Sequence, residues 1–434
     1  MKLKALSTAM ILATVPMTGA FAAGMDRSGQ SIAAFLQPGN YFEAGISVLD
    51  PNVSGKVKNG YTPSPSAPAS MVGLQNTNLS DMADDYYFPA AALKLQLTDQ
   101  FSFGLLYDQP FGAEATYAVN DQGSTLLGGV GLFHDGNDAT SVEVDTQTLS
   151  VVLGYQPTEN FNFYGGGVYQ TVKGDVQLRG LAYGGADNFG GYNAKIGEDS
   201  AVGWLAGFAY QIPEIALKAS VTYRSEIDHK VTIDESSIAS VGLNPGTVIN
   251  MHNGQGQTEI TTPQSVNLDF QTGIMANTVA FANVRWVDWS SFSIRPHAFG
   301  KASEAASTQL TQGAYTKGFN LVDYSDDQIS ATVGVGRKLN DQWAGNVSVG
   351  WDSGAGNPVS TLGPTEGYWN VGLGVQYSPA PNYFIAGGVK YFMLGDATAH
   401  SGAYSIPGNA QNAQVATFED NDAWAYGLKI GYRF

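Results

Sequence analysis

The final twelve residues of the chain alternate strictly between large apolar side chains and small or basic ones. The apolar series is Trp424, Tyr426, Leu428, Ile430, Tyr432 and Phe434, and the intervening series is Ala423, Ala425, Gly427, Lys429, Gly431 and Arg433. A period of two places successive side chains on opposite faces of a β-strand. One apolar face and one small or basic face are typical of a strand that separates lipid from a lumen.

The same alternation recurs upstream, at residues 215–224 and 369–378. A soluble β-sandwich would alternate in the same way, so the period alone does not decide the fold class. The spacing of the alternating segments is more informative. We place strands, an even number of them, at residues 40–50, 86–97, 100–110, 141–156, 160–179, 199–211, 214–233, 259–272, 277–294, 319–338, 342–353, 366–378, 382–395 and 420–434.

Short turns and long loops alternate between these strands. The short turns include Thr98-Asp99, Pro157-Thr158-Glu159, Ile212-Pro213, Asn340-Asp341 and Pro379-Ala380-Pro381. The long loops span residues 51–85, 111–140, 180–198, 234–258, 295–318, 354–365 and 396–419. In outer-membrane barrels, short turns lie at the periplasmic rim and long loops face outward. The sequence therefore predicts an all-β fold, a fourteen-stranded antiparallel transmembrane β-barrel.

The N-terminus predicts export. Lys2 and Lys4 precede an apolar run at residues 5–20, and Ala20-Phe21-Ala22 supplies the small residues of a cleavage site. We expect residues 1–22 to be a cleaved signal peptide. No later stretch offers the roughly 18 consecutive apolar residues that indicate a membrane-spanning helix. An integral membrane protein with this sequence must then be a barrel, and we expect it in the bacterial outer membrane.

Composition agrees with a lipid-facing barrel. Charged residues make up 14% of the chain, below the usual share of about a quarter, whereas aromatic residues reach 12% and glycine is abundant. The formal net charge of −17 disfavours nucleic acid as a partner. The chain has no cysteine, which excludes disulfides and thiolate chemistry.

Catalytic and metal sites find little support in the sequence. The five histidines are scattered, and none shows a spacing that suggests a serine-histidine pair of the kind a hydrolase requires. We therefore predict that the protein is not an enzyme and has no cofactor. Acidic clusters could hold Ca²⁺, but none has the spacing of a calcium loop, and a solvated rim is the simpler interpretation. These clusters are Asp81, Asp84 and Asp85; Asp326 and Asp327; and Glu419, Asp420 and Asp422.

Three charged residues are expected to point into the lumen if the alternation holds: Lys173 on the fifth strand, and Arg224 with Glu226 on the seventh. They could brace the wall or bind a ligand, and an anionic head group would favour Lys173 or Arg224. Pro110, near the end of the third strand, deletes a backbone donor. It marks either an opening toward lipid or the point where the strand meets its loop.

Several segments together resemble the FadL family of outer-membrane transporters of long-chain fatty acids and related hydrophobic compounds. They are Gln109-Pro110-Phe111-Gly112, Thr222-Tyr223-Arg224-Ser225-Glu226, Val287-Asp288-Trp289-Ser290-Ser291-Phe292, and Gly350-Trp351-Asp352-Ser353 followed by Pro358. The resemblance covers most of the mature chain. It implies an N-terminal hatch in the lumen, an apolar pocket, and lateral release through a kink in strand three at Gln109, Pro110, Phe111 and Gly112.

The chain departs from the family in its hatch. The family's Asn-Pro-Ala motif has its nearest match in Gln37-Pro38-Gly39, early in the mature chain, so we expect a short hatch at residues 23–39, with Phe35 and Leu36 folded inward, and a barrel at residues 40–434. On strand ten, where relatives can carry a second basic ligand contact, Ser325 occupies the position and Lys317 is the nearest basic residue.

The leading hypothesis is passive uptake of long-chain fatty acids through an apolar lumen. The alternatives are an aromatic hydrocarbon channel, which needs no charged anchor, and a general hydrophilic porin. The expected partners are the hydrophobic cargo, outer-membrane lipid and lipopolysaccharide, and we expect a monomer.

Overall fold

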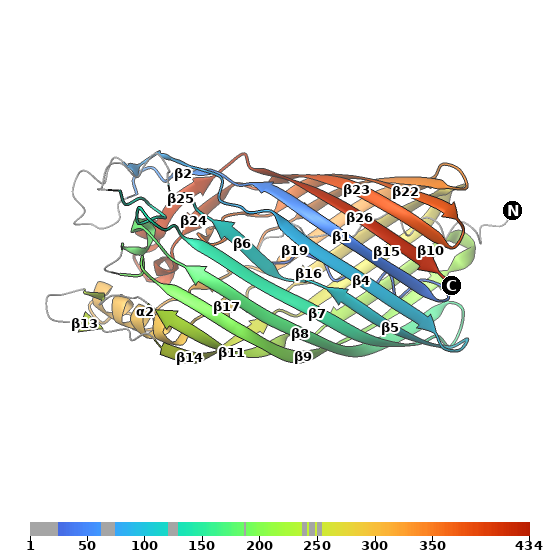
Figure 1. Cartoon of the computed structure of the whole chain (residues 1–434), viewed down its shortest axis with the longest axis horizontal. Helices are drawn as coiled ribbons and strands as arrows, with labels where there is room; N and C mark the ends of the chain where they lie inside the picture. The colour runs from blue at the N-terminus through green and yellow to red at the C-terminus, as the bar shows by residue number, and fades with distance from the viewer. Residues whose placement is uncertain are drawn as a thin grey trace.

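A computed structural model describes residues 25–61, 74–119, 129–185, 188–236, 241–242, 248–249 and 254–434. The expected signal peptide lies outside these ranges. The described residues form one closed barrel with strands inclined to its long axis (Figure 1). None of their helices is long and apolar enough to cross a membrane.

Fourteen strands form the wall, and we number them one to fourteen in chain order. Three of them are interrupted and consist of two labelled elements each. They are β1 (Tyr41–Asn52), β4 (Tyr86–Gln96), β5 (Phe101–Asp108) with β6 (Gly112–Thr116), β7 (Ser141–Tyr155), β8 (Phe161–Gln177), β9 (Asn193–Ile212), β10 (Leu217–Arg224) with β11 (Ile227–Ser236), β14 (Gly254–Thr262) with β15 (Ser265–Met275), β16 (Thr278–Val287), β19 (Gln328–Lys338), β20 (Trp343–Asp352), β22 (Tyr368–Ala380), β23 (Tyr383–Leu394) and β26 (Asp422–Arg433). Strand one pairs antiparallel with both strand fourteen and strand two, which closes the barrel and confirms the predicted fold class.

The remaining elements belong mostly to the long connections. They are β2 (Gly55–Val57), β3 (Asn78–Leu79), η5 (Leu181–Tyr183), β12 (Val241–Gly242), β13 (Val248–Ile249), β17 (Ser293–Ile294), α2 (His297–Leu310), β18 (Val322–Asp323), β21 (Val359–Ser360), β24 (Ala397–His400), η7 (Gly402–Ser405), α3 (Ala410–Ala413) and β25 (Gln414–Phe418). One short turn also contains a helical element, η6 (Pro213–Ile215). The long connections gather at one end of the barrel, and the C-terminus lies at the other (Figure 1).

The outer surface carries an apolar belt, with polar residues between this belt and the long loops. On β7, the outward residues Leu149 and Tyr155 bound an exposed apolar stretch, whereas the outward Glu143, Asp145 and Gln147 are polar. Strand fourteen exposes the whole apolar series of the C-terminal alternation. This pattern is typical of a barrel surface that meets lipid and then the polar interface.

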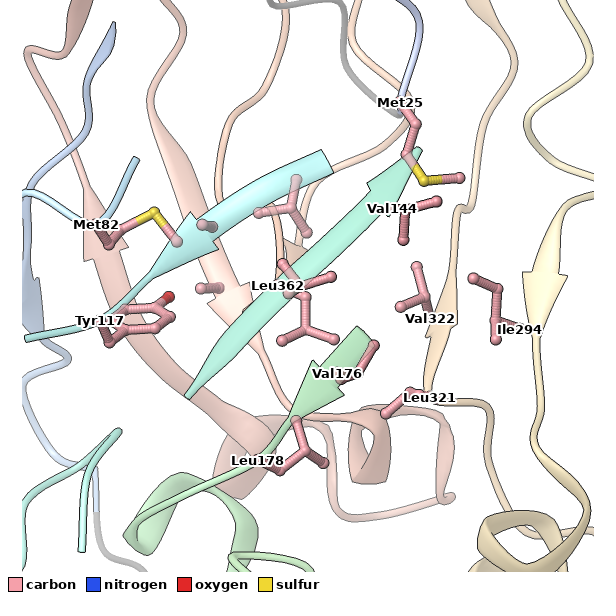
Figure 2. Packing of buried hydrophobic residues seen from close by; sticks show 14 of the residues in the cluster. Met25, Met82, Tyr117, Val144, Val176, Leu178, Ile294, Leu321, Val322 and Leu362 are labelled. Atoms are coloured by element: carbon pink, nitrogen blue, oxygen red, sulfur yellow. The ribbon is translucent and has the colours of Figure 1, made fainter. Parts of the chain in front are cut away.

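The lumen contains two packed regions. The region beneath the long loops is a large apolar core, in which Figure 2 shows Met25 beside Val144, with Met82 and Tyr117 further along. The region nearer the short turns has a smaller cluster around Phe35. Both regions include residues from the N-terminal segment, which we define as residues 25–39.

Some strand boundaries differ from those expected. Strand six begins at Asn193, six residues earlier than predicted, and strand ten begins at Gln328 rather than at residue 319. The residues before strand ten do not join the ladder of the wall, because Val322–Asp323 pair with Ser293–Ile294. The carboxylate of Asp327 accepts hydrogen bonds from the indole of Trp286 and the backbone of Ser290. Helix α2 lies in a segment that was expected to be loop.

Candidate functional site

Strands two and three stop pairing near the outer edge of the apolar belt. β4 and β5 pair from Gln96↔Ser102 to Ala91↔Tyr107, and their next backbone bridge is the isolated one between Ala83 and Ala115. Between these points the hydroxyl of Tyr86 reaches across, donating to the carbonyl of Glu114 and accepting from its N–H, both at 2.5 Å. Strand three also has one extra residue opposite strand four, because Asp108 pairs with Thr148 but Gly112 pairs with Asp145. Strand three therefore kinks and resumes, and an unpaired stretch separates it from strand two. We call this stretch the strand 2–3 gap.

The N-terminal segment closes the strand 2–3 gap from the lumen. The backbone N–H of Arg27 donates to the carbonyl of Pro110 at 2.6 Å, and the N–H of Gly112 donates to the carbonyl of Met25 at 2.8 Å. The guanidinium of Arg27 stacks on the ring of Tyr86, 4.0 Å from its centroid. A Cβ on Gly112 would lie 2.3 Å from Cζ of Arg27, so a side chain at this position would displace the guanidinium.

A buried polar cluster holds the segment to strand nine. Arg285 donates from Nε to Oδ2 of Asp26 at 2.6 Å, and its Nη2 donates to Oε1 of Gln30 at 3.0 Å. Its Nη1 donates to Oδ1 of Asn267 at 2.7 Å. Both ions are almost fully buried, and such a pair is tolerated because the remaining polar atoms are hydrogen-bonded. Ser28 adds a bond to Asp108, at the start of the kink.

The later part of the segment is anchored lower in the lumen. Phe35 is fully buried and meets Tyr164 edge-on at 5.8 Å. Gly104 and Gly154 make room for its ring, since a Cβ on Gly104 would lie 2.5 Å from it. Two lysines bind the carbonyls that follow, with Lys218 donating to Leu36 at 2.7 Å and Lys94 to Gln37 at 2.9 Å.

The expected hatch residues therefore divide into two groups. Phe35, Leu36 and Gln37 are buried in the lumen, whereas Pro38 and Gly39 are exposed where the chain enters strand one. Gly39 has a φ of +68°, a conformation that glycine adopts at little cost. Of the expected opening residues, Pro110, Phe111 and Gly112 are buried behind the N-terminal segment, and Gln109 is half-buried.

Two spaces lie on either side of this segment. The larger, about 260 Å³, lies between the segment and the lower wall, and Arg224, Lys218 and Asp108 line it. The smaller, about 10 Å³, is a nearly closed apolar pocket beneath the loops, lined by residues that include Met25, Phe111, Trp289 and Phe292, and it must widen to admit a ligand. The two spaces thus offer an apolar compartment and a charged one.

Only one of the four predicted ligand contacts lies in the lumen. Arg224 points inward, is buried and borders the larger cavity. Lys173 was expected to point inward, but it is exposed and pairs with Asp145 at 3.4 Å. The prediction was wrong because the even-numbered residues of strand five, such as Val172 and Val176, are the ones that face inward.

Glu226 was also expected to face the lumen and is instead exposed on the outer face. Strand seven is interrupted after Arg224, and the interruption shifts the alternation by one residue, so that Ile227 and His229 point inward. Lys317 is exposed in the loop after α2, where its carbonyl accepts a hydrogen bond from Arg295. The structure does not bring it near Arg224.

The same interruption belongs to a second unpaired stretch, the strand 6–7 gap. Strand seven pairs with strand six through β10 and again at residues 233–236 of β11, but residues 226–232 have no ladder partners on β9. His229, fully buried, spans this gap: Nδ1 lies 3.2 Å from Oδ2 of Asp199, and Nε2 lies 3.1 Å from Oε1 of Gln170. Thr262 of strand eight donates to the same Gln170 oxygen.

Sequence reasoning missed Asp26, Arg27, Arg285 and His229. The alternation through strand nine does place Arg285 inward, so a search for buried charges on that strand would have found it. The role of Asp26 and Arg27 depends on contacts with residues more than 50 positions away, for which the sequence offers no signal. Within the described ranges, no three potential metal-ligating side chains gather in one place.

Glu366 is an acid of the extracellular loops whose pKa is strongly raised. Glu366 lies in the loop that precedes β22 and is half-buried there. Burial, together with the nearby carboxylate of Asp326, raises the pKa of Glu366 to about 7.

Comparison with known proteins agrees with this architecture. The sequence profile of the outer membrane protein transport protein family (OMPP1/FadL/TodX) matches residues 31–434. No curated protein matches in sequence. Among solved structures, a Pseudomonas aeruginosa FadL homologue is 15% identical, with 98% of this chain and 99% of that chain covered and a TM-score of 0.65.

Two further structures are similar over the same extent. The Pseudomonas putida toluene transporter TodX is 12% identical with a TM-score of 0.58, and the Ralstonia pickettii toluene transporter TbuX is 11% identical with a TM-score of 0.53; each comparison covers 98% of this chain and 99% of the other. At these low identities, the structural similarity shows the fold alone. The family profile spans nearly the whole chain. The chain belongs to the OMPP1/FadL/TodX family of outer-membrane proteins that transport hydrophobic compounds.

Proposed function

We propose that this chain takes up long-chain fatty acids, or similar amphiphilic molecules, by passive diffusion. The observation that carries the proposal is the state of Arg224. Its side chain is buried at the edge of the larger cavity, and its Nη1 has no hydrogen-bond partner among the described residues. A buried donor left unpaired costs free energy. The carboxylate of a fatty acid would supply the missing acceptor through a charge-assisted hydrogen bond.

The proposed route ends at the strand 2–3 gap. Cargo partitions from the loops into the apolar pocket, because burial of apolar surface is worth about 25 cal/mol per Å². Residue Met25 of the N-terminal segment and Phe111 of the kink both line this pocket. Withdrawal of residues 25–27 would therefore open the pocket and the gap together, and cargo would leave sideways into the membrane.

A second candidate is uptake of monoaromatic hydrocarbons. The apolar pocket favours it, because its two threonines already use their hydroxyls in hydrogen bonds to Phe111 and Gln170. Phe111 and Trp289 meet edge-on at 5.5 Å in this pocket, a surface suited to an aromatic ring. Two of the similar structures are those of toluene transporters. A hydrophilic porin is disfavoured, since buried aromatic residues occupy much of the lumen.

The deciding experiment compares uptake of labelled oleate and labelled toluene by cells that lack their own transporters and produce this protein. We expect oleate uptake, and we expect Arg224→Gln to lower the affinity for oleate about tenfold, the equivalent of one charge-assisted hydrogen bond. Lys173→Gln is the matched control, because it removes a cation from the outer face. Toluene uptake without oleate uptake would support the second candidate. Equal oleate affinity in the wild type and Arg224→Gln would contradict the role of Arg224.

A further inference from the structure

Two glycines on the lipid-facing side of the wall are not required by the fold. Gly345 on strand eleven and Gly387 on strand thirteen both point outward, and neither has a positive φ. A Cβ on Gly345 would meet its nearest atom at 3.4 Å, and one on Gly387 at 3.7 Å, both ordinary contact distances. Lumen-facing Gly431 differs, since a Cβ there would lie 2.0 Å from the ring of Phe384. Glycine weakens a strand and often marks a place where another molecule approaches.

These glycines form the floor of an apolar groove. Gly345, Val375 and Gly387 lie directly opposite one another in the ladder, so two of the three side-chain positions in this row are empty. The groove is walled on one side by the next outward row, Val335, Val347, Leu373 and Val389. The row on the other side is Leu339, Trp343, Tyr377 and Ile385. The groove has a volume of about 620 Å³.

The groove has one charged end. Arg337 of strand ten lies directly opposite Gly345, is exposed, and lines the groove. The ion pairs of the described residues do not include it. An arginine at the margin of an apolar belt extends its guanidinium toward polar head groups at the membrane surface.

The groove also has the direction that a lipid requires. Arg337 is the second-last residue of its strand, next to a short turn, whereas Gly387 lies farther from its own short turn, at the fifth position of strand thirteen. The row of Arg337, Gly345, Val375 and Gly387 therefore runs from the short-turn rim at Arg337 into the apolar belt at Gly387. Short turns mark the periplasmic side, so the charged end lies at the periplasmic surface of the membrane.

We propose that this groove binds a phospholipid of the periplasmic leaflet, with one acyl chain over Gly345 and Gly387 and the phosphate paired with Arg337. A guanidinium binds phosphate through charge-assisted hydrogen bonds. The groove opens on the outer face of strands ten to thirteen, away from the strand 2–3 gap, and the wall beneath it is shared with the larger cavity through Asn346, Leu373, Gly374, Gly388 and Val389.

The test is native mass spectrometry of the detergent-purified, delipidated barrel titrated with phosphatidylglycerol. We expect the wild type to retain one phosphatidylglycerol. Arg337→Gln should weaken binding about tenfold, and the double variant Gly345→Leu with Gly387→Leu should retain none. Gly167→Leu is the matched control, because Gly167 is an outward glycine with no atom within 4 Å of its Cβ position and does not line the groove.

Heat-modifiable migration on gels checks that each variant is folded. The proposal requires diacylglycerol, which lacks the phosphate, to bind the wild type and Arg337→Gln equally. Retention of phosphatidylglycerol by the double leucine variant would overturn the proposal, as would an equal loss in Gly167→Leu. A wild-type dimer that the double variant converts to a monomer would also overturn it, by identifying the groove as a contact between two copies.

Discussion

The wall has two gaps between neighbouring strands, and they are closed in different ways. The strand 2–3 gap is closed mainly by backbone and side chains of the N-terminal segment, a separate piece of chain held in the lumen, and Tyr86 is the side chain of the wall that joins them there. The strand 6–7 gap is closed by His229 and Asp199, which belong to the two strands that border it. A closure formed by a separate segment can be withdrawn while the wall keeps its shape. A closure formed by the wall itself can open only if the wall deforms.

The two gaps also differ in what surrounds them. At the strand 6–7 gap, strand eight is interrupted opposite the break in strand seven, yet the register between these two strands is the same on both sides. Hydrogen bonds at Gln170 then tie strands five, seven and eight together. At the strand 2–3 gap, Pro110 cannot donate, and the segment supplies the missing partners. We infer that only the strand 2–3 gap is built to open.

The largest expected effect comes from locking the segment in the strand 2–3 gap. Asp26 and Phe111 are bridge partners flanked by the two backbone hydrogen bonds, so they form the closely spaced kind of antiparallel pair. Cysteines at both positions satisfy the spacing of a disulfide, and the chain has no other cysteine. We expect oxidised Asp26→Cys/Phe111→Cys to lose oleate uptake, and the reduced form to recover it.

The two single-cysteine variants control for the loss of each side chain, and their uptake should not respond to reductant. If the oxidised double variant transported oleate as well as its reduced form, cargo would not pass through the strand 2–3 gap. The comparison between the two gaps would then lose its functional meaning.

The next effect is release of the segment. Arg285→Gln leaves the buried carboxylate of Asp26 without a counter-ion, which typically costs about 3–5 kcal/mol. We expect faster hydrogen exchange at residues 25–37 and greater permeability of cells to hydrophobic antibiotics. Arg295→Gln is the control, since it breaks the exposed pair with Glu304, worth at most about 1 kcal/mol. Unchanged exchange in Arg285→Gln would show that the segment is held by other contacts.

The strand 6–7 gap should respond in stability and not in transport. His229→Leu removes the hydrogen bonds to Asp199 and Gln170, at a cost of about 1–3 kcal/mol. We expect a lower thermal unfolding temperature, together with unchanged oleate uptake and antibiotic permeability. Thr261→Val is a milder control, because it removes an exposed bond to Asp228 that joins strands seven and eight. Increased permeability in His229→Leu would make the strand 6–7 gap a second port.

These gaps also mark the limit of what the sequence could predict. The strand count, the closure and the rhythm of turns and loops follow from period-two alternation, and the structure confirms them. The lumen assignment of Glu226 failed because the alternation shifts at the interruption of strand seven, and a shift of one residue moves every later side chain to the other face. Ser225-Glu226 contains no glycine or proline that would indicate an interruption of the strand. Pro263 lies opposite, on strand eight.

Arg224 was placed correctly because it precedes that shift, and Pro110 correctly located the interruption of strand three. The contacts that close the strand 2–3 gap were beyond reach. Asp26 and Arg285 are 259 positions apart, and no local sequence pattern around either residue predicts that they pair. Long-range pairs of this kind depend on how the barrel closes around the segment, which local periodicity does not encode.

The smallest expected effect is a pH response of the extracellular loops that leaves both gaps unchanged. Burial is the chief reason that the pKa of Glu366 is raised from its ordinary value of 4.5 to about 7. The neutral carboxyl therefore favours the closed loop, and this contribution is complete below pH 4.5 and lost as the pH rises through 7. We expect hydrogen exchange at residues 353–367, corrected for its intrinsic pH dependence, to accelerate between pH 5 and 8, and Glu366→Gln to remove the change. Because Glu366 borders neither gap, exchange at residues 25–37 should stay constant over the same range. A parallel acceleration there would mean that the loops and the N-terminal segment open together, and the strand 2–3 gap would then be controlled from outside the cell.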